Sequence, residues 1–244
     1  MKLLLKTIIA ALVITAISCS KSTNEINHVV ESKPLRIAFL NDKSMSVKDS
    51  VSADELDVLM EEVVQRGGKF IYGEMTKFAP KFYTLSIAMP PQVSEKIDRK
   101  NPFKVNIVAK KQAEEKLKNE TDNYLRTRDI QFATFSNSLD HIVPNSFRSD
   151  YSDITIALEK LDAELCLQSP YSQPYDTWII IHSDMKDDWI GAGGLRTFEN
   201  FKCPSNYPII IIGNNGAGNV GLQEGTFINV GTLSEAITYI KSKL

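Results

Sequence analysis

The sequence has few of the residues that build metal sites from nitrogen and sulfur ligands. Its 244 residues include three cysteines and three histidines, and no two cysteines form a CxxC pair. The histidines are scattered, at His28, His141 and His182. A structural zinc site needs four such ligands at characteristic spacings. The sequence therefore argues against zinc.

The chain also lacks an excess of charge of either sign. It has 28 Lys and Arg against 30 Asp and Glu, which gives a formal net charge of −2 at pH 7. Proteins that bind nucleic acid or an anionic membrane surface usually carry a clear basic excess. We therefore expect no nucleic-acid partner and no membrane contact through the folded domain.

The common signatures of hydrolases and phosphoryl-transfer enzymes are missing. The sequence has no GxSxG elbow, no phosphate-binding loop with its lysine and no Asp-x-Asp pair after the first predicted strand. His182 alternates into an apolar strand, which favours a core or neighbouring position over a general base. A literal GxGxxG occurs at residues 216–221, but a dinucleotide site needs a helix directly after it. Here the chain continues into an expected edge strand at 226–230, so a surface loop is favoured.

The N-terminal apolar run, Ile8 to Ile17, is too short to span a membrane stably. It follows a basic start and ends at Ala16-Ile17-Ser18-Cys19, which resembles a bacterial lipoprotein cleavage box. We expect residues 1–18 to be a signal peptide, Cys19 to carry the lipid and residues 19–33 to form a flexible tether. The alternative is an ordinary signal peptide with an incidental cysteine.

The expected compartment is the bacterial cell envelope. No Asp follows Cys19, so we predict anchoring on the outer membrane, with membrane contact through the lipid alone. This compartment permits disulfides, and Cys166 and Cys203 could pair. Because Cys166 lies inside a predicted helix, a buried thiol is the favoured alternative.

The most informative stretch is Leu35 to Ser46, which reads LRIAFLNDKSMS. Its apolar part predicts a buried strand. Three oxygen-bearing side chains follow at alternate positions, and these are Asp42, Ser44 and Ser46. They would converge beyond the carboxyl end of the strand, where open α/β sheets bind ligands. A carboxylate with two hydroxyls suits a hard cation such as Mg²⁺.

An Asp-x-Ser-x-Ser motif after a first apolar strand resembles the metal-ion-dependent adhesion site of von Willebrand factor A-type (vWA) domains. A second part of the resemblance lies in the predicted helix that runs from Tyr151 to about Leu167. Matching Ile154 and the Ala157-Leu158 pair to the family pattern puts Ser152 on the position of the family's ligand threonine. Thr155 is the alternative, and Ser152 could instead be a plain N-cap.

The third part of the resemblance is the apolar strand TWIIIHSD, Thr177 to Asp184. Family members end this strand in Thr/Ser-Asp-Gly, and this sequence has Ser183-Asp184-Met185. The resemblance therefore implies that Asp184 faces the cation, and that Met185 alters the shape of the loop. The implied ligand set is Asp42, Ser44, Ser46, Ser152 and Asp184.

Together with the remaining pattern, the resemblance implies a three-layer, doubly wound α/β domain over residues 34–244. We expect a mostly parallel sheet, with one antiparallel edge strand from a hairpin at 69–89 and helices on both faces. A capping box at Ser52 to Glu55 starts one helix, and Gly67-Gly68 ends it. A helical insertion occupies about 91–147, either as one long helix or as two that are separated by a break near residues 127–129. An amphipathic helix packed on the sheet is its favoured interpretation, and a partner-binding helix is the alternative.

The resemblance implies metal-dependent protein binding. Mg²⁺ is the expected cation, with Mn²⁺ and Ca²⁺ as alternatives, and a Glu or Asp from an unknown protein partner would complete its coordination. No catalytic constellation is found, so we do not expect an enzyme. Two alternatives stay open: a degenerate vWA scaffold that binds no metal and acts as a structural subunit, and a Mg²⁺-dependent hydrolase.

Overall fold

The computed structural model describes eleven stretches or single residues, at 33–47, 50–78, 80–91, 107–146, 148–167, 175–185, 198, 201, 207–213, 222 and 227–244. Contacts divide the chain into residues 1–32 and a unit from Lys33 to Leu244. The predicted signal peptide, the lipidation site Cys19, Cys203 and the GxGxxG glycines lie outside the described residues. Within the described part, no helix is both long and apolar enough to cross a membrane.

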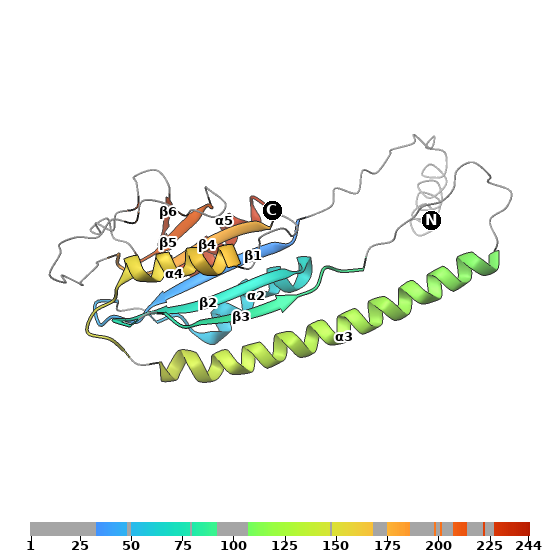
Figure 1. The fold of residues 1–244 in the computed structure, drawn as a ribbon, viewed down its shortest axis with the longest axis horizontal. Helices are drawn as coiled ribbons and strands as arrows, with labels where there is room; N and C mark the ends of the chain where they lie inside the picture. The colour runs from blue at the N-terminus through green and yellow to red at the C-terminus, as the bar shows by residue number, and fades with distance from the viewer. Residues whose placement is uncertain are drawn as a thin grey trace, which may run out of the picture. The chain divides into compact units, whose positions relative to one another are not determined.

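Six strands form one sheet in the order β3-β2-β1-β4-β5-β6. Every neighbouring pair is parallel except β2 with β3, which is antiparallel at the sheet edge. This confirms the predicted mixed sheet and its antiparallel edge strand (Figure 1). The strands are β1 (Leu35–Asp42), β2 (Gly68–Met75), β3 (Phe82–Ile87), β4 (Asp176–His182), β5 (Ile209–Ile212) and β6 (Phe227–Val230).

Alternation along β1 divides the core into two layers. Ile37 and Phe39 pack in one cluster with α2 (Ala53–Arg66), α5 (Leu233–Lys241) and the end of α3. Ala38 and Leu40 pack in the other cluster with α4 (Ile154–Leu167). Because successive side chains of a strand point to opposite faces, a strand buried on both faces needs helices on both sides. The domain is therefore the three-layer, doubly wound α/β fold that the sequence predicts.

The helix α2 begins and ends where the sequence predicts. The Ser52 hydroxyl accepts a hydrogen bond from the Glu55 backbone N–H, and the Glu55 carboxylate accepts one from the Ser52 N–H. These reciprocal bonds satisfy two amide groups that a bare helix start leaves without partners. Gly67 ends the helix with a φ of 75°, a value that favours glycine.

The insertion contains one continuous helix, α3 (Ile107–Asn145), with no break near residues 127–129. Its 39 residues would span about 58 Å at the usual rise of 1.5 Å per residue, which is about twice the length of an eight-residue strand. Its C-terminal part supplies Leu139 and Val143 to the core, and Phe135 packs edge-on against Phe70 of β2. This end of α3 reaches the carboxyl end of β1, where the Asp42 loop begins.

Arg36 is a buried charge within β1, with 1 % of its surface exposed. Its guanidinium donates to the Thr177 hydroxyl, to the Leu165 carbonyl in the last turn of α4 and to the Tyr207 hydroxyl. Carbonyls in the last turn of a helix have no partners within the helix and carry partial negative charge. Arg36 therefore ties the end of α4 to the sheet and helps to fix the helix whose start lies at the Asp42 loop.

Candidate metal centre

Asp42 is the last residue of β1, near the middle of the sheet, and only 3 % of its surface is exposed. One carboxylate oxygen, Oδ1, accepts a hydrogen bond from the Ser44 N–H at 2.8 Å. The other, Oδ2, accepts one from the Ser183 hydroxyl at 2.6 Å and one from the Ser152 hydroxyl at 3.2 Å. Residues 110 and 141 positions away in the sequence thus meet at a single carboxylate.

The loop after Asp42 pairs with the segment that precedes α4. Ser44 forms a parallel bridge with Ser149, in which the Ser149 N–H donates to the Lys43 carbonyl and the Met45 N–H donates to the Ser149 carbonyl. The Ser44 and Ser46 hydroxyls lie 2.9 Å apart and share a hydrogen bond. This pairing carries the start of α4, and Ser152 with it, to the Asp42 loop.

Ser152 is not the N-cap of α4. The helix begins at Ile154, and the Asp153 carboxylate accepts a hydrogen bond from the Ile156 N–H at 2.8 Å, as an N-cap side chain does. The Ser152 hydroxyl is fully buried and donates to Asp42 instead. The geometry thus brings Ser152 to the cluster, while Thr155, the alternative, lies buried in the first turn of the helix.

The hydroxyl that reaches Asp42 from β4 belongs to Ser183, which the predicted ligand set omits. Ser183 is fully buried, and its Oγ also accepts a hydrogen bond from the Met185 N–H at 2.9 Å. Asp184 lies half-buried at the next position. Alternation along the strand was the signal that could have identified Ser183, because Ile179 and Ile181 pack on the α4 side of the sheet, the side from which Ser152 comes.

His182 lies apart from this cluster. It is buried, and its Nδ1 hydrogen-bonds the Asn41 side-chain oxygen at 3.0 Å. The Asn41 amide in turn donates to the Tyr72 hydroxyl, which donates to Glu74. These bonds make His182 part of a buried polar network between neighbouring strands, in keeping with the neighbouring role that the sequence favours.

The Asp42 carboxylate is buried, and among the described residues no cationic side chain is paired with it. Burial raises its pKa, and the hydrogen bonds from Ser183, Ser44 and Ser152 act in the opposite direction. No lysine, arginine or histidine among the described residues forms an ion pair with Asp42. A buried carboxylate without a cation is costly, so a bound metal ion would stabilise this site.

The donors at this site fit a hard cation. The described residues contain no group of three His, Cys, Asp or Glu side chains that could hold a metal, so carboxylate and hydroxyl oxygens are the available ligands. A serine hydroxyl that donates its proton to Asp42 keeps its lone pairs for another partner, and Ser152 is in this state. Ser183 uses a lone pair for the Met185 N–H, which suits an orienting role. Oxygen donors of this kind are what Mg²⁺ prefers.

Met185 adopts a backbone conformation that normally selects glycine. Its φ is 57°, the only positive φ among the described residues other than glycine, and its side chain is 2 % exposed in the α4-side cluster. The resemblance implies a glycine at this position, and Met185 adopts a φ that favours glycine. Burial of the methionine side chain offsets the cost of this backbone conformation.

We therefore expect Met185→Gly to destabilise the protein although glycine suits the backbone conformation at this position. Burial of a methionine side chain is worth about 1.5–3 kcal/mol, and glycine adds unfolded-state entropy, whereas relief of strain returns only about 1 kcal/mol or slightly more. The free energy of unfolding, measured in urea, should fall by about 1–2 kcal/mol. Met185→Leu, which keeps the buried volume, should change it less. A gain in stability for the glycine variant would contradict this account.

Comparisons with known proteins give no close relative. No protein-family model matches the sequence, and no curated protein is recognisably related to it. Among solved structures, proximal thread matrix protein 1 from the mussel byssus matches with a TM-score of 0.44 and 14 % identity, over 86 % of this chain and 47 % of its own. The ArnB paralog VWA2 from Sulfolobus acidocaldarius matches with a TM-score of 0.34 and 11 % identity, over 84 % and 44 %. The chain thus spans less than half of either neighbour, and these scores do not assign it to a family.

Proposed function

We propose that this protein is a vWA-type module, anchored in the cell envelope, that binds a protein partner through a divalent cation at Asp42. The observation that carries the proposal is the gathering of hydroxyls around a buried carboxylate. Ser152 and Ser183 both donate to Asp42, and the same loop holds the hydrogen-bonded pair Ser44 and Ser46. The order of these segments in the chain and the strand order of the sheet support the same interpretation.

Each residue has a distinct task in this proposal. Asp42, Ser44, Ser46 and Ser152 would hold the ion, with Asp184 as the second carboxylate that the resemblance implies. Ser183 would orient Asp42 from the neighbouring strand. A bound Mg²⁺, or Mn²⁺ or Ca²⁺ in its place, would supply a positive centre that a Glu or Asp of the partner can reach. Because hydroxyls are neutral ligands, they leave the centre attractive to an outside carboxylate.

A Mn²⁺ titration of the purified protein tests this function. Mn²⁺ is paramagnetic and speeds the relaxation of water protons. The relaxation rate therefore reports both the binding of Mn²⁺ and the water molecules that stay coordinated to the bound ion. We expect one saturable site per chain, and a drop in the relaxation enhancement when a glutamate-containing peptide replaces that water. The same peptide with glutamine in place of glutamate should produce no drop.

Other results would favour the alternatives. The absence of a saturable Mn²⁺ site would leave a degenerate scaffold that acts as a structural subunit. Metal-dependent turnover of simple phosphate or carboxylate esters would favour a hydrolase instead. The anchoring is tested separately, since labelled palmitate should enter the wild-type chain in bacterial cells and not the Cys19→Ala chain.

A further inference from the structure

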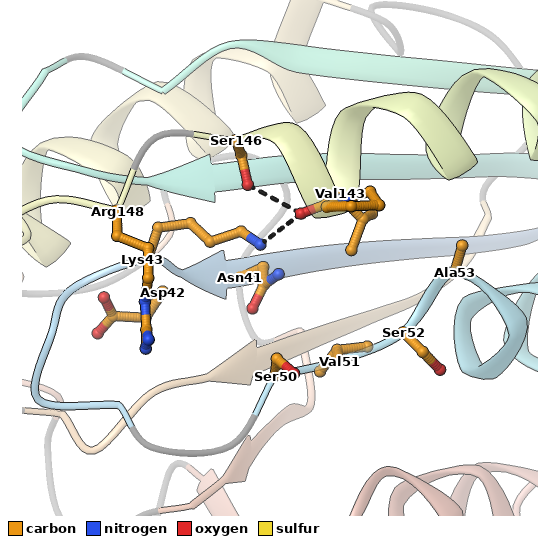
Figure 2. A pocket seen from close by; sticks show the side chains of 11 residues that line it. Asn41, Asp42, Lys43, Ser50, Val51, Ser52, Ala53, Val143, Ser146 and Arg148 are labelled. Atoms are coloured by element: carbon orange, nitrogen blue, oxygen red, sulfur yellow. Dashed lines mark hydrogen bonds between the residues drawn. The ribbon is translucent and has the colours of Figure 1, made fainter.

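We propose that a second site, on the other side of the Asp42 loop, binds a small ligand with an acidic head and an apolar body. The site is a pocket of about 360 Å³ between the loop that follows β1 and the end of α3 (Figure 2). This volume falls in the lower part of the range typical of small-molecule sites, about 300–1,000 Å³. Its lining consists of Asn41, Asp42, Lys43, Ser50, Val51, Ser52, Ala53, Val143, Pro144, Ser146 and Arg148.

Two basic side chains, Lys43 and Arg148, supply the charge of this pocket. The Lys43 ammonium donates a hydrogen bond to the Val143 carbonyl at 3.0 Å. It also forms a long ion pair with Glu74, whose carboxylate oxygen lies 3.9 Å away. The Arg148 guanidinium donates to the Val47 carbonyl at 2.7 Å and, among the described residues, has no carboxylate partner. Arginine offers five N–H donors, so most of the guanidinium stays available for an anion.

Both basic side chains line the same pocket. Like charges that line one pocket repel each other, and an anion placed between them would remove that repulsion. This arrangement selects an acidic head group, either a carboxylate or a phosphate.

The remainder of the lining selects an apolar body. Val51, Ala53, Val143 and Pro144 contribute hydrocarbon surface, and Val51 and Val143 belong to the core cluster on the α2 side of the sheet. Ser50, Ser52 and Ser146 place hydroxyls among them. A pocket with apolar walls and two basic side chains orients an amphiphilic ligand with its acidic head at Lys43 and Arg148.

This pocket is distinct from the metal centre although both include Asp42. The Asp42 carboxylate accepts hydrogen bonds from the Ser44 N–H and from the Ser152 and Ser183 hydroxyls, which belong to the metal centre. Figure 2 shows the Lys43 side chain running across the pocket to Val143, while the Asp42 carboxylate points in another direction. Adjacent residues of an extended chain point to opposite sides, so one loop serves both sites.

A titration by NMR in the presence of EDTA tests this site in the purified protein. The probes are hexanoate, hexyl phosphate and, as the uncharged control, hexanol. We expect saturable shifts with at least one of the two anions, with a dissociation constant on the order of 1 mM, and at least about tenfold weaker binding of hexanol. The stronger of the two anions identifies the head group. Because EDTA removes divalent metal, binding under these conditions does not depend on the metal centre.

Two substitutions and a matched control complete the test. Arg148→Gln removes an exposed charge, and Lys43→Gln removes the second; each should weaken anion binding by about tenfold or more. Arg126→Gln, an exposed arginine of α3 outside the lining, should leave the binding unchanged. The proposal is overturned if neither anion saturates, if hexanol binds as tightly, if Arg148→Gln has no effect, or if binding appears only when metal is restored.

Discussion

Gly68→Ala is expected to lower the free energy of unfolding by more than about 4 kcal/mol, or to prevent folding altogether. Gly68 opens β2 and pairs with Leu35 of β1, and its φ is 139°, a backbone conformation that other residues rarely adopt. A β-carbon at this position would lie 1.8 Å from the Leu35 carbonyl oxygen. That oxygen belongs to the backbone of the central strand, so relief requires a shift of β1 against β2 and not a change of rotamer.

Gly231→Ala is the matched control for this prediction. A β-carbon at Gly231 would meet only the Glu235 side chain, at an ordinary 3.5 Å. We expect this variant to stay within about 1 kcal/mol of the wild type. Urea denaturation followed by circular dichroism measures both variants. Equal stabilities for the two would show that the approach of Gly68 to β1 does not constrain the sheet.

The strands and the mostly parallel sheet were predictable because the sequence carries strong local signals. Uninterrupted apolar runs such as Leu35 to Leu40 are typical of strands buried on both faces, and the Ser52 capping box and Gly67 mark the ends of α2. The Asp42 motif and its resemblance to a known family then placed Ser152 beside it. That contact joins residues 110 positions apart, so no local pattern alone could have supplied it.

Other features depend on contacts that no local pattern encodes. Arg36 counts as one polar residue in an apolar run, yet it is buried because the Leu165 carbonyl and the Tyr207 hydroxyl, both distant in the sequence, accept its hydrogen bonds. Ser183 rather than Asp184 reaches Asp42 because the strand alternation turns its side chain to that face. The Lys43 and Arg148 pocket exists because the end of α3 comes to lie beside the Asp42 loop.

Asp42→Asn is expected to weaken divalent-metal binding by at least about 100-fold while leaving the metal-free protein as stable as the wild type or more so. Asparagine has nearly the same size and keeps one oxygen acceptor for the Ser152 and Ser183 hydroxyls. It carries no charge, and its amide nitrogen cannot accept the hydrogen bond of the Ser44 N–H. The charge is the costly part of the metal-free site, because the carboxylate is buried with hydrogen bonds and no cation. Removal of the charge should offset the loss of the Ser44 hydrogen bond, which is worth about 1 kcal/mol. The free energy of unfolding should therefore equal the wild-type value or exceed it by up to about 1 kcal/mol.

Metal affinity and stability must be measured on the same variants, because a change in only one of them fits both a metal-binding and a purely structural role of Asp42. Calorimetry with Mn²⁺ and urea denaturation in EDTA should be run on the wild type, on Asp42→Asn and on Asp150→Asn, an exposed neighbour that should behave as the wild type. If Asp42 serves a cation, affinity falls and stability does not. If Asp42 only holds the loops together, the wild type binds no metal and the asparagine variant is less stable, because the hydrogen bonds of the serines to a charged acceptor are weakened. Unchanged Mn²⁺ affinity in Asp42→Asn would place any metal elsewhere in the chain.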